Sequence, residues 1–266
     1  MNEPALLPVV ATSSHSLPED IRNHTVSAYS GWRQELHDFW SFLKKPVRGP
    51  AVSLPLHQGW RRILLLLGVQ LIVVILVTLP FNTLLDNWVG IENRNKEWNG
   101  YRLAFMIVLA PLLEEFIFRA GLRKATYSLL IGPLIVCASL DIGIIVLVLA
   151  VLLMLLALAG WLRLRWMQSA AGIRFARGRA FIHRYSYIFW MYAIGFGLVH
   201  IRNFYSSTGR DYLLVLAISS QLSFGIVCGY LRLRQGLRSS IALHALFNST
   251  LVAVAFVAES LLEWDF

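Results

Sequence analysis

Long apolar stretches constrain this chain more than any other feature of its sequence. Several windows of about 18 residues or more carry few or no charges, which is long enough to cross a bilayer as an α-helix. The chain is 57% hydrophobic and its mean hydropathy is +0.60, too high for an ordinary soluble domain of 266 residues. Backbone groups in lipid must be satisfied within the span, and the alternating pattern of a membrane barrel is missing. The predicted fold class is therefore all-α, a polytopic helical membrane protein.

We expect about seven transmembrane helices, with the amino terminus in the cytoplasm. Their windows are 63–81, 101–122, 127–140, 142–162, 185–201, 212–231 and 240–258. We count 127–162 as a hairpin of two crossings, because every Arg-rich loop then lies in the cytoplasm. Its first arm is short, so a re-entrant arm is the alternative. The same rule accounts for the net charge of +9, so we expect the lipid bilayer and no nucleic acid as a partner. The expected location is the cell (inner or cytoplasmic) membrane.

The rest of the chain divides into segments of different character. Residues 1–28 lack periodicity and are expected to be a disordered tail. Within 29–60, an apolar stripe lies opposite polar residues that include Glu35, which predicts an interfacial amphipathic helix or a partner-binding segment. Residues 61–258 form the predicted transmembrane domain, with an insertion at about 127–184, and 259–266 form an acidic tail. Cys137 and Cys228 lie in apolar stretches and predict no disulfide.

Three polar islands interrupt the apolar spans. They are Glu114 and Glu115 with Arg119, Phe196 with His200, and His244 with Asn248. Charged groups in hydrocarbon cost several kcal/mol each unless they are paired or face a wet cavity. Glu115 and Arg119 are four residues apart and can pair on one helical face, which leaves Glu114 free. Each island alone could serve helix packing, but three islands in three spans favour a functional site.

The depth of these groups allows them to meet. From the nearest cytoplasmic marker, Glu114 lies ~14 Å and His244 ~9 Å along the helix axis. Counted from Arg184, His200 lies ~24 Å along the axis, which is too deep, but it lies ~12 Å from Tyr192 if the aromatic belt that ends there marks the interface. One chemistry that fits is amide hydrolysis: Glu114 takes a proton from water that it shares with His200, and His244 with Asn248 donates to the oxyanion. The other is a zinc site formed by Glu114, His200 and His244, although the H-E-x-x-H signature is missing.

The order and spacing of the islands resemble the CPBP intramembrane proteases. This family includes the type II CAAX-processing endopeptidases and the bacterial abortive-infection and bacteriocin-processing proteins, and its motifs are E-E-x-x-x-R, F-x-x-x-H and H-x-x-x-N. The resemblance covers about 101–258. It implies that Glu114 and His200 activate the water, that His244 and Asn248 stabilise the oxyanion, and that Glu115 and Arg119 support the first motif. In the family the first two motifs usually lie on consecutive spans, so the resemblance requires 127–184 to be an insertion.

The function that we expect is an intramembrane endopeptidase. Its substrate would be a membrane-associated peptide or protein, with or without a lipid modification. We favour a glutamate mechanism without a cofactor over zinc, because no ligand set in the sequence demands a metal. The alternative is a non-catalytic, immunity-type member of the same family that binds peptides or partner proteins. A proton-coupled transporter is disfavoured because the two halves of the chain show no internal symmetry.

Overall fold

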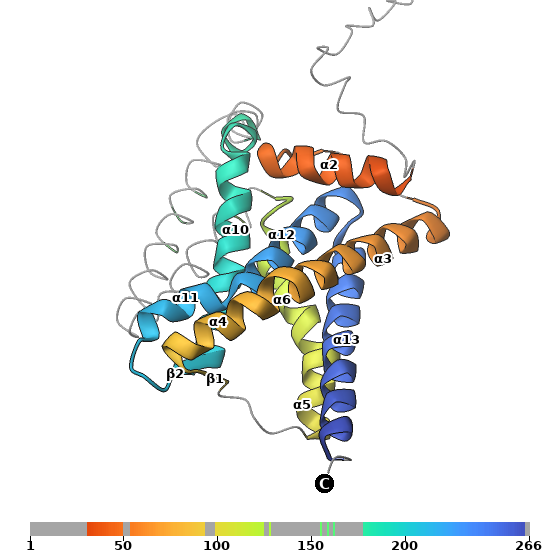
Figure 1. The fold of residues 1–266 in the computed structure, drawn as a ribbon. Coiled ribbons are helices and arrows are strands. Elements are labelled where there is room, and N and C mark those ends of the chain that lie inside the picture. The colour runs from red at the N-terminus through yellow and green to blue at the C-terminus, as the bar shows by residue number, and fades with distance from the viewer. Residues whose placement is uncertain are drawn as a thin grey trace, which may run out of the picture.

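The computed structural model describes residues 31–49, 54–93, 99–124 and 178–263, together with residues 128, 155, 159 and 162. These residues are mostly helical, and Figure 1 shows the helices crossing one another around a shared core. The predicted tail 1–28 and nearly all of the predicted hairpin 127–162 lie outside the described residues.

One continuous helix of 34 residues, Leu56–Val89, is the longest apolar element among the described residues. It consists of α3 (Leu56–Val73), a π-helical turn η1 (Val74–Thr78) and α4 (Leu79–Val89). The π turn ends two residues before Pro80, which lacks an N–H group and crowds the preceding turn, so the helix widens there instead of breaking. Residues 82–89, which lie beyond the predicted span 63–81, are helical, and the helix ends at Gly90 in the left-handed conformation (φ 58°).

The helix that carries the first polar island repeats this arrangement. It consists of α5 (Gly100–Ala104), a π turn η2 (Phe105–Leu109) and α6 (Ala110–Ala120), and Pro111 again lies two residues after the end of the π turn. Asn99 caps its start by accepting a hydrogen bond from the Arg102 amide. Beside α6 lies α13 (Leu237–Glu263), which carries the third island (Figure 1).

The second island follows a shorter helix. α10 (Tyr185–Val199) continues into a 3-10 turn, η3 (His200–Asn203), and then into strand β2 (Phe204–Ser206). β2 pairs antiparallel with β1 (Ile91–Asn93), which holds the end of this segment near the end of α4.

The predicted span 212–231 is broken in the structure. Its parts are η4 (Asp211–Leu213), α11 (Leu214–Ala217) and α12 (Ser219–Arg234), with a bend of 43° between the first two and the third. At the bend, Ile218 leaves the helical region (ψ 15°). The buried side chain of Gln70 reaches this break from α3 and donates to the Ser220 carbonyl and the Ser223 hydroxyl. The break lies where the apolar residues before Ile218 give way to the polar residues Ser219, Ser220 and Gln221, but a hydropathy average over the whole window 212–231 smooths over this change.

Close packing of α10 against its neighbours fixes the second and first islands relative to each other. Gly121 ends α6 directly against Tyr192, and a Cβ atom at residue 121 would lie 1.9 Å from the Tyr192 hydroxyl oxygen. The Tyr185 hydroxyl donates to the Leu122 carbonyl at 2.7 Å. In the core, Phe118 of α6 meets Phe196 of α10 edge to face, with 5.2 Å between ring centroids.

Helix α2 (Trp32–Lys44) lies across the ends of α3, α10 and α12 (Figure 1). Glu35, which we expected on the polar, solvated face, is instead buried at 2% exposure. Its carboxylate pairs with Arg62 of α3 at 2.8 Å and accepts a hydrogen bond from the Tyr230 hydroxyl at 2.8 Å. The prediction for Glu35 is therefore wrong, because helical spacing cannot anticipate a buried cation contributed by another helix.

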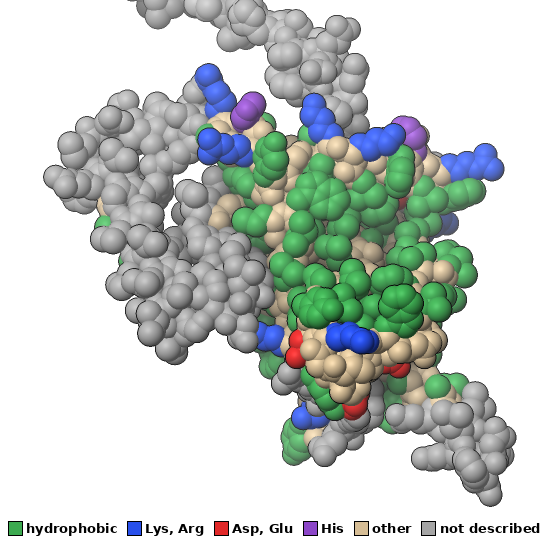
Figure 2. Space-filling model, turned by 60° about the vertical axis from the view of Figure 1, so that its left-hand side comes forward, with side chains coloured by type: hydrophobic (Ala, Val, Ile, Leu, Met, Phe, Trp, Pro, Cys, Tyr) green, Lys and Arg blue, Asp and Glu red, His purple; other side chains and the backbone are tan. Residues whose placement is uncertain are grey.

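Surface composition supports an integral membrane protein. In the described part of the chain, two helices are long and apolar enough to cross a membrane, Leu56–Val89 and Leu237–Ala258, or three if the bent pair is one span. The α5–α6 helix is not among them because it carries too many charges, which include those of the first island. α10 is not among them because its 15 residues are too few to cross the bilayer. Figure 2 shows a broad band of hydrophobic side chains, with many Lys and Arg side chains along one edge and a mixture of Lys, Arg, Asp and Glu along the other. The count of seven spans and the orientation of the amino terminus stay predictions.

Candidate active site

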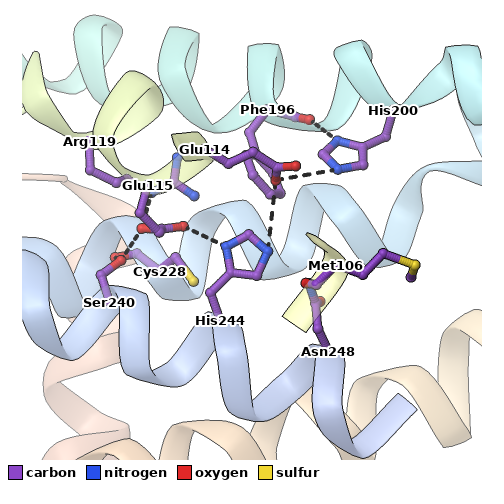
Figure 3. Close-up of polar contacts among 10 residues, drawn as sticks. All are labelled: Met106, Glu114, Glu115, Arg119, Phe196, His200, Cys228, Ser240, His244 and Asn248. Carbon is purple, nitrogen blue, oxygen red and sulfur yellow. Dashed lines mark hydrogen bonds and ion pairs between the residues drawn. The ribbon is translucent and has the colours of Figure 1, made fainter. Parts of the chain in front are cut away.

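Three helical segments contribute polar side chains to one cluster (Figure 3). α6 supplies two adjacent carboxylates and an arginine, the first residue of η3 supplies an imidazole, and α13 supplies a serine, an imidazole and an amide. The residues are Glu114, Glu115, Arg119, His200, Ser240, His244 and Asn248. Because α6, α10 and α13 pack together, islands that are more than a hundred residues apart in the chain come within contact distance.

Glu114 lies between the two histidines. Its Oε2 atom is 3.7 Å from Nε2 of His200 and 3.8 Å from Nε2 of His244. Both separations are longer than a direct hydrogen bond, and Oε2 is a buried atom without a hydrogen-bond partner among the described residues. The Glu114 side chain as a whole is 29% exposed, whereas that of His244 is 4% exposed. The arrangement presents one basic oxygen and two ring nitrogens to a common point at the edge of the core.

The other ring nitrogen of each histidine is occupied. Nδ1 of His200 lies 2.7 Å from the Phe196 carbonyl oxygen, one turn earlier on α10. Nδ1 of His244 lies 3.1 Å from Oε1 of Glu115. A carbonyl or a carboxylate can only accept, so both Nδ1 atoms carry a proton and both Nε2 atoms face Glu114.

Glu115 is the fully buried anion of the cluster. Its Oε2 atom accepts a hydrogen bond from the Ser240 hydroxyl and lies 3.3 Å from Nε of Arg119. The Arg119 guanidinium lies over the Phe196 ring, 4.8 Å from its centroid. The arginine therefore joins the first two islands, which gives the phenylalanine of the second island a role in holding the cation.

Asn248 lies one turn beyond His244 and donates from Nδ2 to the Met106 carbonyl at 2.7 Å. In the π turn of η2 the bonds run from residue i+5 to residue i, as in the bond from Ala110 to Phe105. The matching donor for Met106 would be residue 111, which is a proline without an N–H group. The Asn248 amide thus binds a carbonyl that Pro111 leaves without its helical donor.

The structure brings five of the six predicted site residues into direct contact with one another. They are Glu114, Glu115, Arg119, His200 and His244. Asn248 lies on the same face of α13, but its contact in the structure is with Met106 and not with the carboxylate or the rings. The catalytic roles assigned to these residues stay predictions.

Sequence reasoning missed two contributors to this site. Ser240 precedes His244 by four residues, as His244 precedes Asn248, so the repeated spacing on one helical face was a usable signal. Met106 contributes through its backbone, and its involvement depends on a π turn that side-chain patterns do not reveal.

The described residues contain no group of three or more His, Cys, Asp or Glu side chains arranged to hold a metal ion. Glu114, His200 and His244 have donor types that zinc accepts, but they do not form such a group here.

Comparison with known proteins identifies one relationship. A family model described as type II CAAX prenyl endopeptidase Rce1-like matches residues 96–250, which is more than half of the chain and includes all three islands. No curated protein matches the chain. No solved structure matches it either.

Proposed function

The chain belongs to the CPBP/CAAX protease family, as a type II CAAX prenyl endopeptidase Rce1-like member, and we propose that it is an intramembrane endopeptidase that hydrolyses peptide bonds with a Glu114/His200-activated water. The family is one of proteases, and the apolar helices make the chain an integral membrane protein. The identity of the catalytic groups and the course of the reaction are the proposal.

The observation that carries the proposal is the position of Glu114 Oε2, close to two imidazole Nε2 atoms. Water hydrogen-bonded to Oε2 and to Nε2 of His200 would lose a proton to the carboxylate and attack the carbonyl carbon of the substrate. When the tetrahedral intermediate collapses, the C–N bond breaks and Glu114 returns the proton to the leaving amine. General-base catalysis of this kind contributes about 10²–10⁴-fold to a rate.

His244 and Asn248 would stabilise the oxyanion. Nδ1–H of His244 already donates to Glu115, so Nε2 can donate to the oxyanion only when the ring is the doubly protonated imidazolium. The carboxylates of Glu115 and Glu114, one beside each ring nitrogen, would compensate that positive charge. The Asn248 amide has a second hydrogen beyond the one given to Met106. Donors aimed at a developing oxyanion are worth about 10²–10³-fold each.

We propose a mechanism without a metal cofactor. Zinc is the competing proposal: Glu114, His200 and His244 would hold it, and it would polarise water and the scissile carbonyl. The glutamate mechanism is favoured because both imidazoles direct Nε2 toward a carboxylate oxygen that can take the proton itself.

The proposed setting is a multi-pass protein of the inner or cytoplasmic membrane, with seven spans, of which one is a full crossing or a re-entrant arm, and a cytoplasmic amino terminus. The proposed partners are the bilayer and a membrane-associated peptide or protein substrate, with or without a lipid modification. Trp32 and Trp40 of α2 are 55% and 60% exposed, which suits a helix at the membrane surface. A membrane-impermeant thiol reagent that labels a Trp32→Cys variant in intact cells would contradict this orientation.

The test is a comparison of peptides in membranes that contain the wild-type protein or its Glu114→Gln variant, identified by mass spectrometry. We expect cleavage products with the wild type and a loss of at least about 100-fold in their rate of formation in Glu114→Gln. Glu92→Gln is the matched control, because this carboxylate binds Tyr205 of β2 and lies outside the cluster. Identical peptides with wild type, Glu114→Gln and empty membranes would favour the non-catalytic, binding member of the family.

A further inference from the structure

Ser240 is a buried polar residue that the proposed reaction does not use. It lies on α13, one turn before His244, with 0% exposure. Its hydroxyl donates to Oε2 of Glu115. The Cys228 carbonyl oxygen lies 3.2 Å from the Ser240 hydroxyl oxygen. Because a hydroxyl has one proton and an ionised carboxylate is the stronger acceptor, Glu115 is its principal partner.

The two oxygens of Glu115 have separate partners. Oε2 is held by Ser240 and by Nε of Arg119, whereas Oε1 receives Nδ1–H of His244. Without the hydroxyl, only the 3.3 Å contact with Arg119 would hold Oε2, and the carboxylate could rotate about its terminal torsion, which is soft. Rotation of the carboxylate would move Oε1 away from Nδ1.

The orientation of His244 depends on that contact. His244 is packed by ring contacts with Phe224 and Phe196, at 4.9 Å and 5.9 Å between centroids, which restrict its plane but provide no hydrogen-bond acceptor. Glu115 supplies the acceptor for Nδ1 and so directs Nε2 toward Glu114.

We propose that Ser240 is a positioning residue of the active site, which acts through Glu115 to hold His244 with Nδ1 protonated and Nε2 directed at the reacting groups. This inference rests on the proposed endopeptidase function. It assigns to Ser240 a role that is transmitted through two side chains and involves no contact with the substrate.

The kinetic test uses Ser240→Ala, Ser240→Thr and the matched control Ser239→Ala, which makes the same substitution on the neighbouring residue of α13. We expect Ser240→Ala to lower kcat about tenfold with KM changed less than about twofold, since a hydrogen bond to a charged group is lost outside the substrate site. Ser240→Thr keeps the hydroxyl and should recover at least half of the lost kcat, and the thermal midpoint of each variant is measured alongside. A kcat of Ser240→Ala equal to that of Ser239→Ala would overturn the inference, as would equal losses in Ala and Thr variants that keep the wild-type midpoint.

A spectroscopic arm separates this inference from the proposed function. In protein labelled with ¹⁵N-histidine, the His244 ring signals, assigned with a His244→Gln variant, should report a protonated Nδ1 in the wild type and in Ser239→Ala. They should change in Ser240→Ala, and unchanged signals there would overturn the inference even if the enzyme is active. Wild-type protein that cleaves no more peptide than Glu114→Gln would instead refute the proposed function, whatever the state of His244.

Discussion

Replacement of Glu35 by glutamine should release α2 from the transmembrane helices. The Glu35 and Arg62 side chains are each 2% exposed, and Oε2 of the carboxylate lies 2.8 Å from both Nε and Nη2 of the guanidinium. Glutamine keeps the shape of the side chain and an acceptor for the Tyr230 hydroxyl, but it removes the negative charge. The change therefore leaves a buried arginine without its counter-charge.

The size of the effect follows from burial. Removal of one partner from a buried ion pair costs about 3–5 kcal/mol, whereas an exposed pair contributes about 0–1 kcal/mol. A penalty of 3 kcal/mol or more raises the population of the undocked helix about a hundredfold or more. Asp38→Asn is the matched control on the same helix, because Asp38 is 31% exposed and its contact with His37 is 3.9 Å long.

The assay is hydrogen exchange of the α2 backbone amides in detergent or nanodiscs. We expect the exchange rates in Glu35→Gln to rise about a hundredfold or more and those in Asp38→Asn to rise by less than about tenfold. The double variant Glu35→Leu/Arg62→Met should recover protection, because apolar replacement of both partners is often neutral or stabilising. Exchange in Glu35→Gln that matches Asp38→Asn would refute the reasoning that the pair is buried and holds α2.

Three further predictions concern packing, the polar cluster and the cofactor. Gly121→Ala should lower stability by about 1–3 kcal/mol, because the added Cβ would overlap Tyr192. Gly68→Ala should raise stability by up to about 1 kcal/mol, because a Cβ added there would have no neighbouring side chain or other helix within 4 Å. Thermal midpoints measure both changes, and equal shifts would contradict the packing argument. Pro111→Ala should lower kcat about tenfold, because the new backbone N–H at residue 111 would bind the Met106 carbonyl and release Asn248 from it. Pro80→Ala, which removes the proline after the other π turn, should leave kcat unchanged. Activity should persist after treatment with a zinc chelator, and stoichiometric zinc that tracks activity across preparations would contradict the glutamate mechanism.

Part of the site could be predicted from the sequence because a membrane makes its polar residues conspicuous. A charged group in an apolar span is costly, so the side chains of Glu114, His200 and His244 had to be explained by function or pairing. Helical spacing also placed Glu115 and Arg119 on one face, and the structure pairs them at 3.3 Å.

Other features were beyond prediction because they depend on neighbours that are distant in the chain. The burial of Glu35 requires a cation from α3 and a hydroxyl from α12. The break near Ile218 and the extension of the first helix to Val89 depend on how those segments pack. Polar residues lie at both places, Ser219 to Gln221 after the break and Asn82, Asp86 and Asn87 in the extension, and composition alone does not distinguish a bend, a loop and a helix there.

The sequence by itself determined the class of the protein and the chemistry of its three islands, because bilayer thickness and helical periodicity act on residues that are neighbours in the chain. Only the tertiary structure decided which atoms of those islands meet. The direction of each imidazole, the partner of Asn248 and the link from Ser240 through Glu115 arise where α6, α10 and α13 pack together. Hydrogen bonds are formed over distances near 3 Å, and sequence spacing cannot define positions at that scale between separate helices.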